Sequence, residues 1–284
     1  MDNINTLIIP DVHGRDFWID ALKRYPIEEY PDIDIVFLGD YLDPYDFESI
    51  TEEEAIDNFK DILLFAKDNP KVVMLLGNHD MPYFSETYYG LNSYHCRHST
   101  LHHKEICGIF KEHEDLFRIA YHENNVLFTH AGCSSGWLSF VFEDKYNKEI
   151  DLDELCTDIN GLLKTTQGLL KLYMVSGQRG GFDEFGSCIW ADDDELFSDR
   201  YNQTDCTAIF NVNQVFGHTI QAFRKNPRII EVGSGILSVV DDGIEFGDMI
   251  QIGNLKMIDT ANAYVLDTDK FLIIKLPRNE VEKN

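Results

Sequence analysis

Five short segments place Asp, Asn and His side chains directly after apolar runs of the sequence. They are Asp11-Val12-His13-Gly14, Gly39-Asp40-Tyr41-Leu42-Asp43, Gly77-Asn78-His79-Asp80, Thr129-His130-Ala131-Gly132 and Gly217-His218-Thr219. Carboxylates, an amide oxygen and imidazoles together suit manganese, iron or zinc better than magnesium or calcium, which prefer ligand shells made only of oxygen. If the five segments converge in the fold, they predict one site for two divalent transition metal ions.

The same residue types predict how such a site would act on a phosphate ester. Two ions about 3.5–4 Å apart lower the pKa of a water molecule that bridges them and screen the charge of the attacked phosphate. Asp40 has two carboxylate oxygens and could bridge both ions. His79 is a natural proton donor to a leaving alkoxide because its unperturbed pKa lies near neutrality, and Asp43 could hold its tautomer.

Buried strands are expected to position the first three segments. Residues 7–9, 35–38 and 72–76 are short apolar runs rich in β-branched residues and bounded by turn residues, a pattern typical of buried strands. Each run is followed by Asp, Asn or His at its C-terminal end. In open α/β sheets, this end of the strands is where ligands bind.

Helices are expected between these strands. Residues 17–22 and 51–66 carry apolar side chains at helical spacing, and Thr51 with Glu54 fits a capping box at the start of the second helix. The resulting β-α-β-α-β order favours a mostly parallel sheet with right-handed crossovers.

The rest of the chain divides into a mixed stretch and a β-rich stretch. Residues 83–94 are aromatic and are predicted to be rich in loops, whereas residues 102–115 and 137–175 are predicted to be mostly helical. Short strands are expected at 125–129, 213–216, 228–232, 236–240, 255–259, 263–267 and 271–276. An α/β half is therefore followed by a β-rich half that carries the last histidine segment.

Bulk properties narrow the classes of partner. With 284 residues, 44% of them hydrophobic and 26% charged, the chain is of ordinary globular composition. A formal charge of −26 repels polyanions, so we expect no nucleic acid polymer as a partner. No apolar run approaches the roughly 18 residues of a membrane helix, and no signal peptide is recognisable, so we expect a cytoplasmic protein without a membrane partner. The cysteines show no Cys-x-x-Cys spacing, which favours reduced thiols.

The ordered motifs Asp-x-His-Gly, Gly-Asp-x-x-Asp, Gly-Asn-His-Asp, Thr-His-Ala-Gly and Gly-His-Thr resemble those of the calcineurin-like metallophosphoesterases. The chain is most similar to their phosphoprotein phosphatase branch, which includes bacterial diadenosine tetraphosphatases. Ile189-Trp190-Ala191-Asp192 and Lys256-Met257-Ile258-Asp259-Thr260 are also similar to segments of that branch. The resemblance spans residues 5–260.

The resemblance implies a fold and a set of roles. The fold would be α/β (α+β), a two-sheet β sandwich flanked by helices, with a dinuclear metal site at the C-terminal ends of strands. Residues 1–284 would form a single domain with a mostly helical insertion around 81–120 and 137–175. Asp11, His13 and Asp40 would hold the first metal ion, and Asp40, Asn78, His130 and His218 the second. His79 would be the general acid, oriented by Asp43.

The chain departs from the branch at two positions. Asp43 is followed by Pro44-Tyr45, where the branch has Arg-Gly, and Asp80 stands where it usually has Glu. The missing arginine would grip the phosphate, so another must replace it. The candidates are Arg15, Arg97, Arg179 and Arg200, and we predict Arg179 first and then Arg15 as substrate-binding residues. The glycine-rich loop around Arg179 could bring backbone and guanidinium to the phosphate together.

Three functions are compatible with these motifs. The leading hypothesis is a metal-dependent phosphatase that hydrolyses a phosphomonoester, protein-bound or small, by a hydroxide bridging two ions, with manganese first and iron or zinc as alternatives. A second hypothesis is hydrolysis of a dinucleoside polyphosphate, in which the aromatic stretch at 83–94 would stack on a base. A third is a metal-binding regulatory protein with weak catalysis, suggested by the missing arginine after Asp43.

Overall fold

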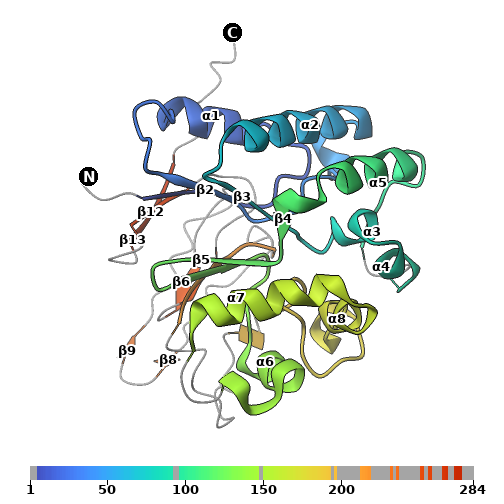
Figure 1. The fold of residues 1–284 in the computed structure, drawn as a ribbon, viewed down its shortest axis with the longest axis vertical. Coiled ribbons are helices and arrows are strands. Elements are labelled where there is room, and N and C mark those ends of the chain that lie inside the picture. Colours follow the sequence, from blue (N-terminus) through green and yellow to red (C-terminus); the bar gives the residue numbers. More distant parts are fainter. Residues whose placement is uncertain are drawn as a thin grey trace.

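Two β-sheets face each other, and helices cover the outer side of each sheet in the computed structural model (Figure 1). The structure describes residues 5–91, 96–146, 150–192, 195–196, 212–218, 231–232, 235–236, 250–252, 255–257, 264–267 and 272–276. In the orientation of Figure 1, α1 and α2 lie above β2 and β3, whereas α6, α7 and α8 lie below β5 and β6. This two-sheet α/β arrangement with flanking helices confirms the predicted fold class.

The first sheet has the strand order β13-β12-β1-β2-β3-β4. Its strands are β1 (Thr6–Ile9), β2 (Asp34–Phe37), β3 (Val72–Leu75), β4 (Phe117–Arg118), β12 (Tyr264–Asp267) and β13 (Leu272–Lys275). β1 to β4 are mutually parallel, as the β-α-β-α-β order predicts, and β12 joins β1 in antiparallel orientation. The C-terminal ends of β1, β2 and β3 therefore lie at the same edge of the sheet.

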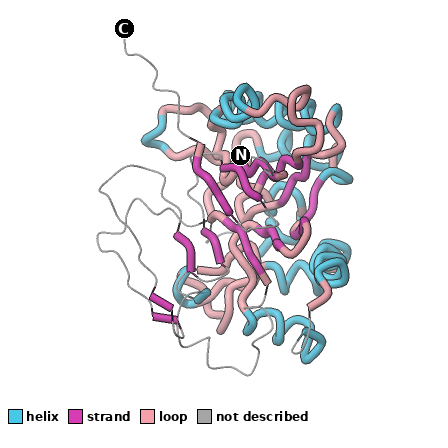
Figure 2. The backbone as a smooth tube through the Cα atoms, turned by 90° about the vertical axis from the view of Figure 1, so that its left-hand side faces the viewer, coloured by secondary structure: helices cyan, strands magenta, loops and turns pink. Residues whose placement is uncertain are grey.

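The second sheet has the order β10-β11-β7-β6-β5. Its strands are β5 (Ala120–Glu123), β6 (Val126–Thr129), β7 (Asn213–Phe216), β10 (Ile250–Ile252) and β11 (Leu255–Met257), and β8 (Glu231–Val232) pairs separately with β9 (Gly235–Ile236). β6 and β7 are parallel, so the histidines that follow them emerge side by side. Figure 2 shows the strands of both sheets from the side.

The core explains why the first strands are apolar on both faces. Ile8, Val36 and Val73 pack between the sheets against Phe128 and Val215 of the second sheet. Their chain neighbours, such as Leu7 and Phe37, belong to the larger core formed with the helices. Strands buried on both faces read as continuous apolar runs rather than alternating ones, which is the pattern that predicted them.

The helices are α1 (Phe17–Arg24), α2 (Glu52–Asp68), α3 (Met81–Phe84), α4 (Glu86–Leu91), α5 (His103–Glu112), α6 (Ser135–Phe142), α7 (Leu152–Gly161) and α8 (Thr166–Leu172). Short 3₁₀ turns lie at Asp46–Glu48, Glu114–Leu116, Glu143–Tyr146, Leu162–Lys164 and Gly177–Arg179. The predicted capping box of α2 is present, with the Thr51 hydroxyl accepting from the Glu54 N–H and the Glu54 carboxylate from the Thr51 N–H.

Some predicted boundaries differ from the structure. Residues 81–91 form α3 and α4 rather than loops, because Tyr83 and Tyr88 are drawn fully into the core as anchors of these short helices. β4, β5 and β10 carry too little periodicity in their few residues to have been predicted. Parts of the predicted strands 228–232 and 236–240 lie outside the described residues.

Two further findings bear on the sequence-based expectations. The cysteines in the described part of the chain are free thiols. None of the described helices combines the length and the hydropathy needed to cross a membrane. The single-domain assignment for residues 1–284, with its helical insertion, stays a prediction.

Candidate metal centre

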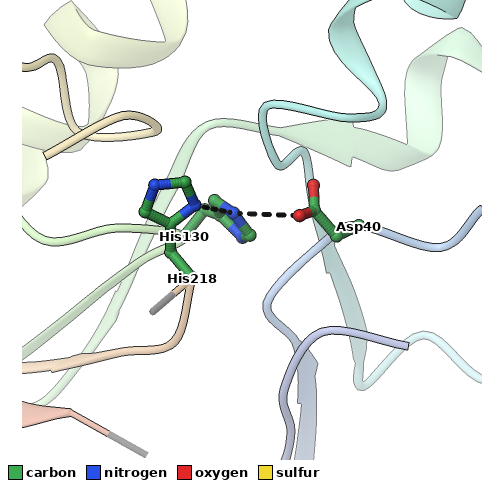
Figure 3. Close-up of side chains that lie close together, drawn as sticks. All are labelled: Asp40, His130 and His218. Atoms are coloured by element: carbon green, nitrogen blue, oxygen red, sulfur yellow. Dashed lines mark hydrogen bonds and ion pairs between the residues drawn. The ribbon is translucent and has the colours of Figure 1, made fainter. Parts of the chain in front are cut away.

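Side chains that follow five different strands converge on one buried site. Asp11, His13 and Asp40 each offer a ligand atom, and these atoms lie within 4.8 Å of one another. Asp40, His130 and His218 form a second group that meets the same criterion. Asp40 belongs to both groups, as a carboxylate that bridges two cations would. Figure 3 shows the second group, with the Asp40 carboxylate facing the two imidazoles.

In its neutral form, His130 directs the lone pair of Nε2 at the centre of the second group. Its Nδ1–H donates to the Leu38 carbonyl oxygen at 2.9 Å, so Nε2 of the neutral ring carries no proton. This Nε2 lies 3.0 Å from Asn78 Oδ1, 3.1 Å from His218 Nδ1 and 3.4 Å from Asp40 Oδ2. A proton placed between these four atoms could form a hydrogen bond with only one or two of them, whereas a divalent cation can bind all of them at once. The donor set therefore fits a transition metal ion.

His13 is oriented in the same way for the first group. Its Nδ1–H donates to the Leu42 carbonyl at 2.9 Å, which leaves Nε2 without a proton and 3.6 Å from Asp40 Oδ2. Backbone carbonyls thus fix both imidazoles, in the manner of the outer partners of metal-binding histidines. His218 Nε2 is buried and has no hydrogen-bond partner in the described part of the chain.

The backbone holds the site residues in a conformation that is rare for side chains with a Cβ. Positive φ angles occur at His13 (45°), Asp40 (52°), Asp43 (59°) and His218 (72°), and elsewhere among the described non-glycine residues only at Ser49, Asn124 and Glu143. Such residues cost of order 1–3 kcal/mol each and cluster at functional sites. Packing of the two-sheet fold therefore offsets the conformational free energy of these backbone turns, which direct the side chains toward the centre.

Glycines allow the carboxylates to approach the strand ends closely. A Cβ on Gly77 would lie 2.1 Å from Asp40 Oδ1, and a Cβ on Gly217 would lie 2.5 Å from Asp11 Oδ1. No side chain fits at either position without displacing a predicted ligand. The glycines of the Gly-Asn-His-Asp and Gly-His-Thr motifs are thus part of the geometry of the site.

Burial and neighbouring charges set the pKa values of the predicted ligands. Burial alone would lower the pKa of His130, but the carboxylates of Asp40 and Asp11 raise it to about 9. Burial raises the pKa of Asp11 to about 6, against the opposing effect of His130. Burial lowers the pKa of His13 to about 3 and that of His218 well below its usual range. His13 and His218 are therefore neutral at physiological pH, as ligands must be.

His79 lies beside these groups and pairs with Asp43. His79 Nδ1 is 3.2 Å from Asp43 Oδ2 and 3.1 Å from the Arg97 carbonyl oxygen. Burial alone would lower the pKa of His79, but the carboxylates of Asp40 and Asp43 outweigh it and raise that pKa. With Nδ1–H bound to these acceptors, Nε2 is the nitrogen that remains for another partner.

A sequence model of the calcineurin-like phosphoesterases matches residues 4–222 of the chain. The protein belongs to the calcineurin-like phosphoesterase family. This match covers all five motif segments, and it agrees with the two ligand groups at the strand ends. No match was found among curated proteins.

Solved structures share the fold of this calcineurin-like phosphoesterase. A cold-active protein-tyrosine phosphatase from a psychrophilic Shewanella species is 17% identical, with a TM-score of 0.52, and the alignment covers 97% of this chain and 81% of that one. A protein serine/threonine phosphatase from Saccharomyces cerevisiae with similarity to human phosphatase PP5 is 14% identical, with a TM-score of 0.51 and coverage of 99% and 82%. At these identities the likeness concerns the fold.

Two residues of this calcineurin-like centre were missed by sequence reasoning. The buried Asp80 carboxylate accepts from the N–H groups of Asp40, Tyr41 and Gly77, and so ties the loop after β2 to the loop after β3. The Tyr83 hydroxyl donates to Asp43 Oδ1 at 2.6 Å and holds this carboxylate against His79. Asp80 ends a recognised motif and could have been found there. Tyr83 stands in an aromatic stretch without any distinguishing signal.

The two arginines predicted to bind substrate are already paired. Arg179 Nε lies 2.8 Å from Asp192 Oδ2, and Arg15 Nε donates to Glu48 Oε1 at 2.7 Å. Of the other candidates, Arg97 donates to the Asp43 carbonyl, whereas Arg200 lies outside the described residues. The substrate-binding roles of Arg179 and Arg15 stay predictions.

Proposed function

We propose that this protein hydrolyses phosphomonoesters with the help of two divalent transition metal ions, of which manganese is the first choice and iron or zinc the alternatives. The observation that carries the proposal is the pair of buried ligand groups that share Asp40. Two-metal phosphoester hydrolysis uses two ions about 3.5–4 Å apart, and Asp40 would be the ligand common to both ions. Membership of the calcineurin-like phosphoesterase family supports the same reaction class.

Six side chains would bind the two ions. Asp11, His13 and Asp40 would hold one ion, and Asp40, Asn78, His130 and His218 the other. When bound, the two ions would lower the pKa of a coordinated water molecule and screen the negative phosphoryl oxygens. The carbonyls of Leu38 and Leu42 keep the imidazoles of His130 and His13 in the ligating tautomer.

His79 would act as the general acid. Asp43 and the Arg97 carbonyl accept from its Nδ1–H, and this arrangement favours the imidazolium whose Nε2–H can be given to the leaving oxygen. Tyr83 fixes the second oxygen of Asp43, so the carboxylate cannot turn away from the ring. Asp43 and Tyr83 would thus be positioning residues.

A phosphomonoester, protein-bound or small, is the favoured substrate. In the aromatic stretch that suggested a dinucleoside polyphosphate, Tyr83 and Tyr88 are buried in the core, and only Tyr89 is exposed among the tyrosines that the structure describes there. Tyr88 accepts from the Trp190 indole N–H, and its ring contacts Tyr173. These rings stabilise the helices beside the site and are not available to stack on a base.

The experiment is hydrolysis of p-nitrophenyl phosphate, a phosphoserine peptide and diadenosine tetraphosphate by protein loaded with manganese, iron or zinc. We expect metal-dependent release of phosphate from the monoesters. Asp40→Asn should lower kcat/KM by at least about 100-fold, since a metal centre contributes several kcal/mol. Asp32→Asn, at a fully exposed side chain, is the matched control. Metal binding without turnover of any substrate would favour the regulatory alternative instead.

A further inference from the structure

Three arginines of the described chain border the metal centre, and two of them have carboxylate partners. Arg15 is held by Glu48, and its Nη1 donates to the Asp11 carbonyl, so that its side chain is only 13% exposed. Arg179 is held by Asp192. A neighbouring carboxylate offsets part of the positive charge that an arginine presents to a phosphate dianion.

Arg97 differs from both. Its residue is exposed, and none of the described carboxylates lies within ion-pair distance of its guanidinium. Nη2 donates to the Asp43 carbonyl oxygen at 3.0 Å, and the guanidinium carbon lies 4.0 Å from the centre of the Tyr45 ring. The guanidinium has five N–H donors, so the bond to Asp43 leaves further donors for a ligand. The group is thus accessible, charged and held in place by a neutral acceptor and an aromatic face.

Arg97 is attached to the catalytic region on two sides. Its own carbonyl accepts from His79 Nδ1–H, and its side chain binds the residue whose carboxylate also faces His79. On the other side, the Tyr45 ring meets the His13 imidazole edge-on, with 4.9 Å between ring centres. A single aromatic ring therefore separates the Arg97 guanidinium from a predicted metal ligand.

We infer that Arg97, held on the face of Tyr45, binds the phosphoryl oxygens of the substrate beside His79. This inference rests on the proposed function. It also accounts for the local sequence, in which Pro44-Tyr45 and not an arginine follows Asp43. A tyrosine at this position cannot bind a phosphate dianion by charge, but its ring can hold a guanidinium supplied by a distant segment. The planar fork of arginine suits two oxygens of one phosphoryl group.

The test compares Arg97→Gln and Arg97→Lys with the wild type on p-nitrophenyl phosphate and with inorganic phosphate as inhibitor. We expect Arg97→Gln to raise both KM and the inhibition constant of phosphate by about 10–100-fold, the usual worth of a hydrogen bond to a charged group. Arg97→Lys should recover part of the loss. Tyr45→Leu should weaken phosphate binding less, by about 3–10-fold, because it removes only the support.

Controls separate binding from folding and from metal loss. Arg24→Gln, in the last turn of α1, makes the same charge change and should leave the phosphate constant unaltered. Metal content and the unfolding temperature should stay at the wild-type value in the Arg97 and Arg24 variants. Arg179→Gln and Arg15→Gln are measured in parallel, and a larger effect there with none at Arg97 overturns the inference.

Failure of the inference and failure of the proposed function look different. An active wild type with an equally active Arg97→Gln variant refutes the role of Arg97 alone. A wild type that turns over none of the phosphoesters refutes the proposed function. In that case calorimetric titration of the metal-loaded protein with inorganic phosphate still decides on Arg97, because Arg97→Gln must weaken this binding for the inference to stand.

Discussion

The Asp80 carboxylate accepts a hydrogen bond from the backbone N–H of Asp40 at 2.7 Å and thereby joins two strand ends. The same oxygen accepts from the Gly77 N–H at 2.8 Å, and the other oxygen accepts from Tyr41. The loops after β2 and β3 supply Asp40 and Asn78, so their spacing depends on this one buried side chain. Asp80 thus positions the ligands Asp40 and Asn78 through hydrogen bonds to the backbone of their loops, without contacting the two ligand side chains.

We predict that Asp80→Asn weakens metal binding by about 10–100-fold, the usual cost of disturbing an outer partner of a metal site. The amide NH₂ would face backbone donors, so the free energy of unfolding of the metal-free protein should also fall, by about 1–3 kcal/mol. Metal titration and chemical unfolding measure the two effects. Asp32→Asn serves as the exposed control, and equal behaviour of the two variants would contradict the role given to Asp80.

The affinity for metal ions should depend on pH in a defined way. A proton and a cation compete for the Nε2 lone pair of His130, whose pKa is raised to about 9, and for the carboxylate of Asp11, whose pKa is raised to about 6. Below pH 9 the His130 proton must leave before the ion binds, so affinity should rise about tenfold per pH unit from pH 6 to 9. Below pH 6 the Asp11 proton is added, and the slope should steepen.

Calorimetric titrations in two buffers of different ionisation enthalpy count the released protons directly. We expect about one proton per site at pH 7.5 and more at pH 5.5. His130→Gln should remove the upper part of this dependence together with much of the affinity. Affinity that does not change between pH 6 and 9 would show that His130 binds no proton in competition with the ion.

The general-acid role predicted for His79 can be separated from metal binding by the choice of leaving group. His79→Asn should lower kcat by about 10²–10⁴-fold for a phosphoserine peptide, whose alkoxide needs a proton. The loss should be smaller for p-nitrophenyl phosphate, whose phenolate leaves readily without one. Metal content should stay unchanged. Equal losses on both substrates would count against proton donation, and Asp43→Asn should reproduce the pattern in weaker form.

Much of this site could be predicted because its ligands stand at the ends of strands that are unmistakable in the sequence. Runs such as residues 35–38 are buried on both faces, and the residue types of Asp40 and His130 reveal their chemistry at once. The supports could not be predicted in the same way. The carbonyl of Leu38 and the hydroxyl of Tyr83 act through positions in space that no local pattern encodes.

The choice among the candidate phosphate-binding arginines also depended on contacts that the sequence does not show. Sequence reasoning favoured Arg179 because glycines surround it, yet a glycine-rich loop does not reveal the ion pair with Asp192. The contacts of Arg97 with Tyr45 and Asp43 join residues far apart in the chain, and a single sequence carries no sign of them. Tertiary contacts therefore decide which of several equivalent side chains is accessible.

A last prediction concerns Gly77, whose missing side chain makes room for a ligand. A Cβ at this position would lie 2.1 Å from Asp40 Oδ1 and 2.8 Å from Asp40 N, so Gly77→Ala must displace the shared carboxylate or the loop that carries it. We expect metal affinity to fall by about 100-fold or more and the metal-free protein to lose about 1–3 kcal/mol of unfolding free energy.

The matched control is Gly108→Ala in α5, where a Cβ meets nothing within 4 Å. Alanine there should stabilise the helix by up to about 1 kcal/mol and leave metal binding unchanged. Metal titration of both variants decides the matter, since a Gly77→Ala protein that binds metal as tightly as the Gly108→Ala protein would mean that Asp40 is not confined as the structure places it.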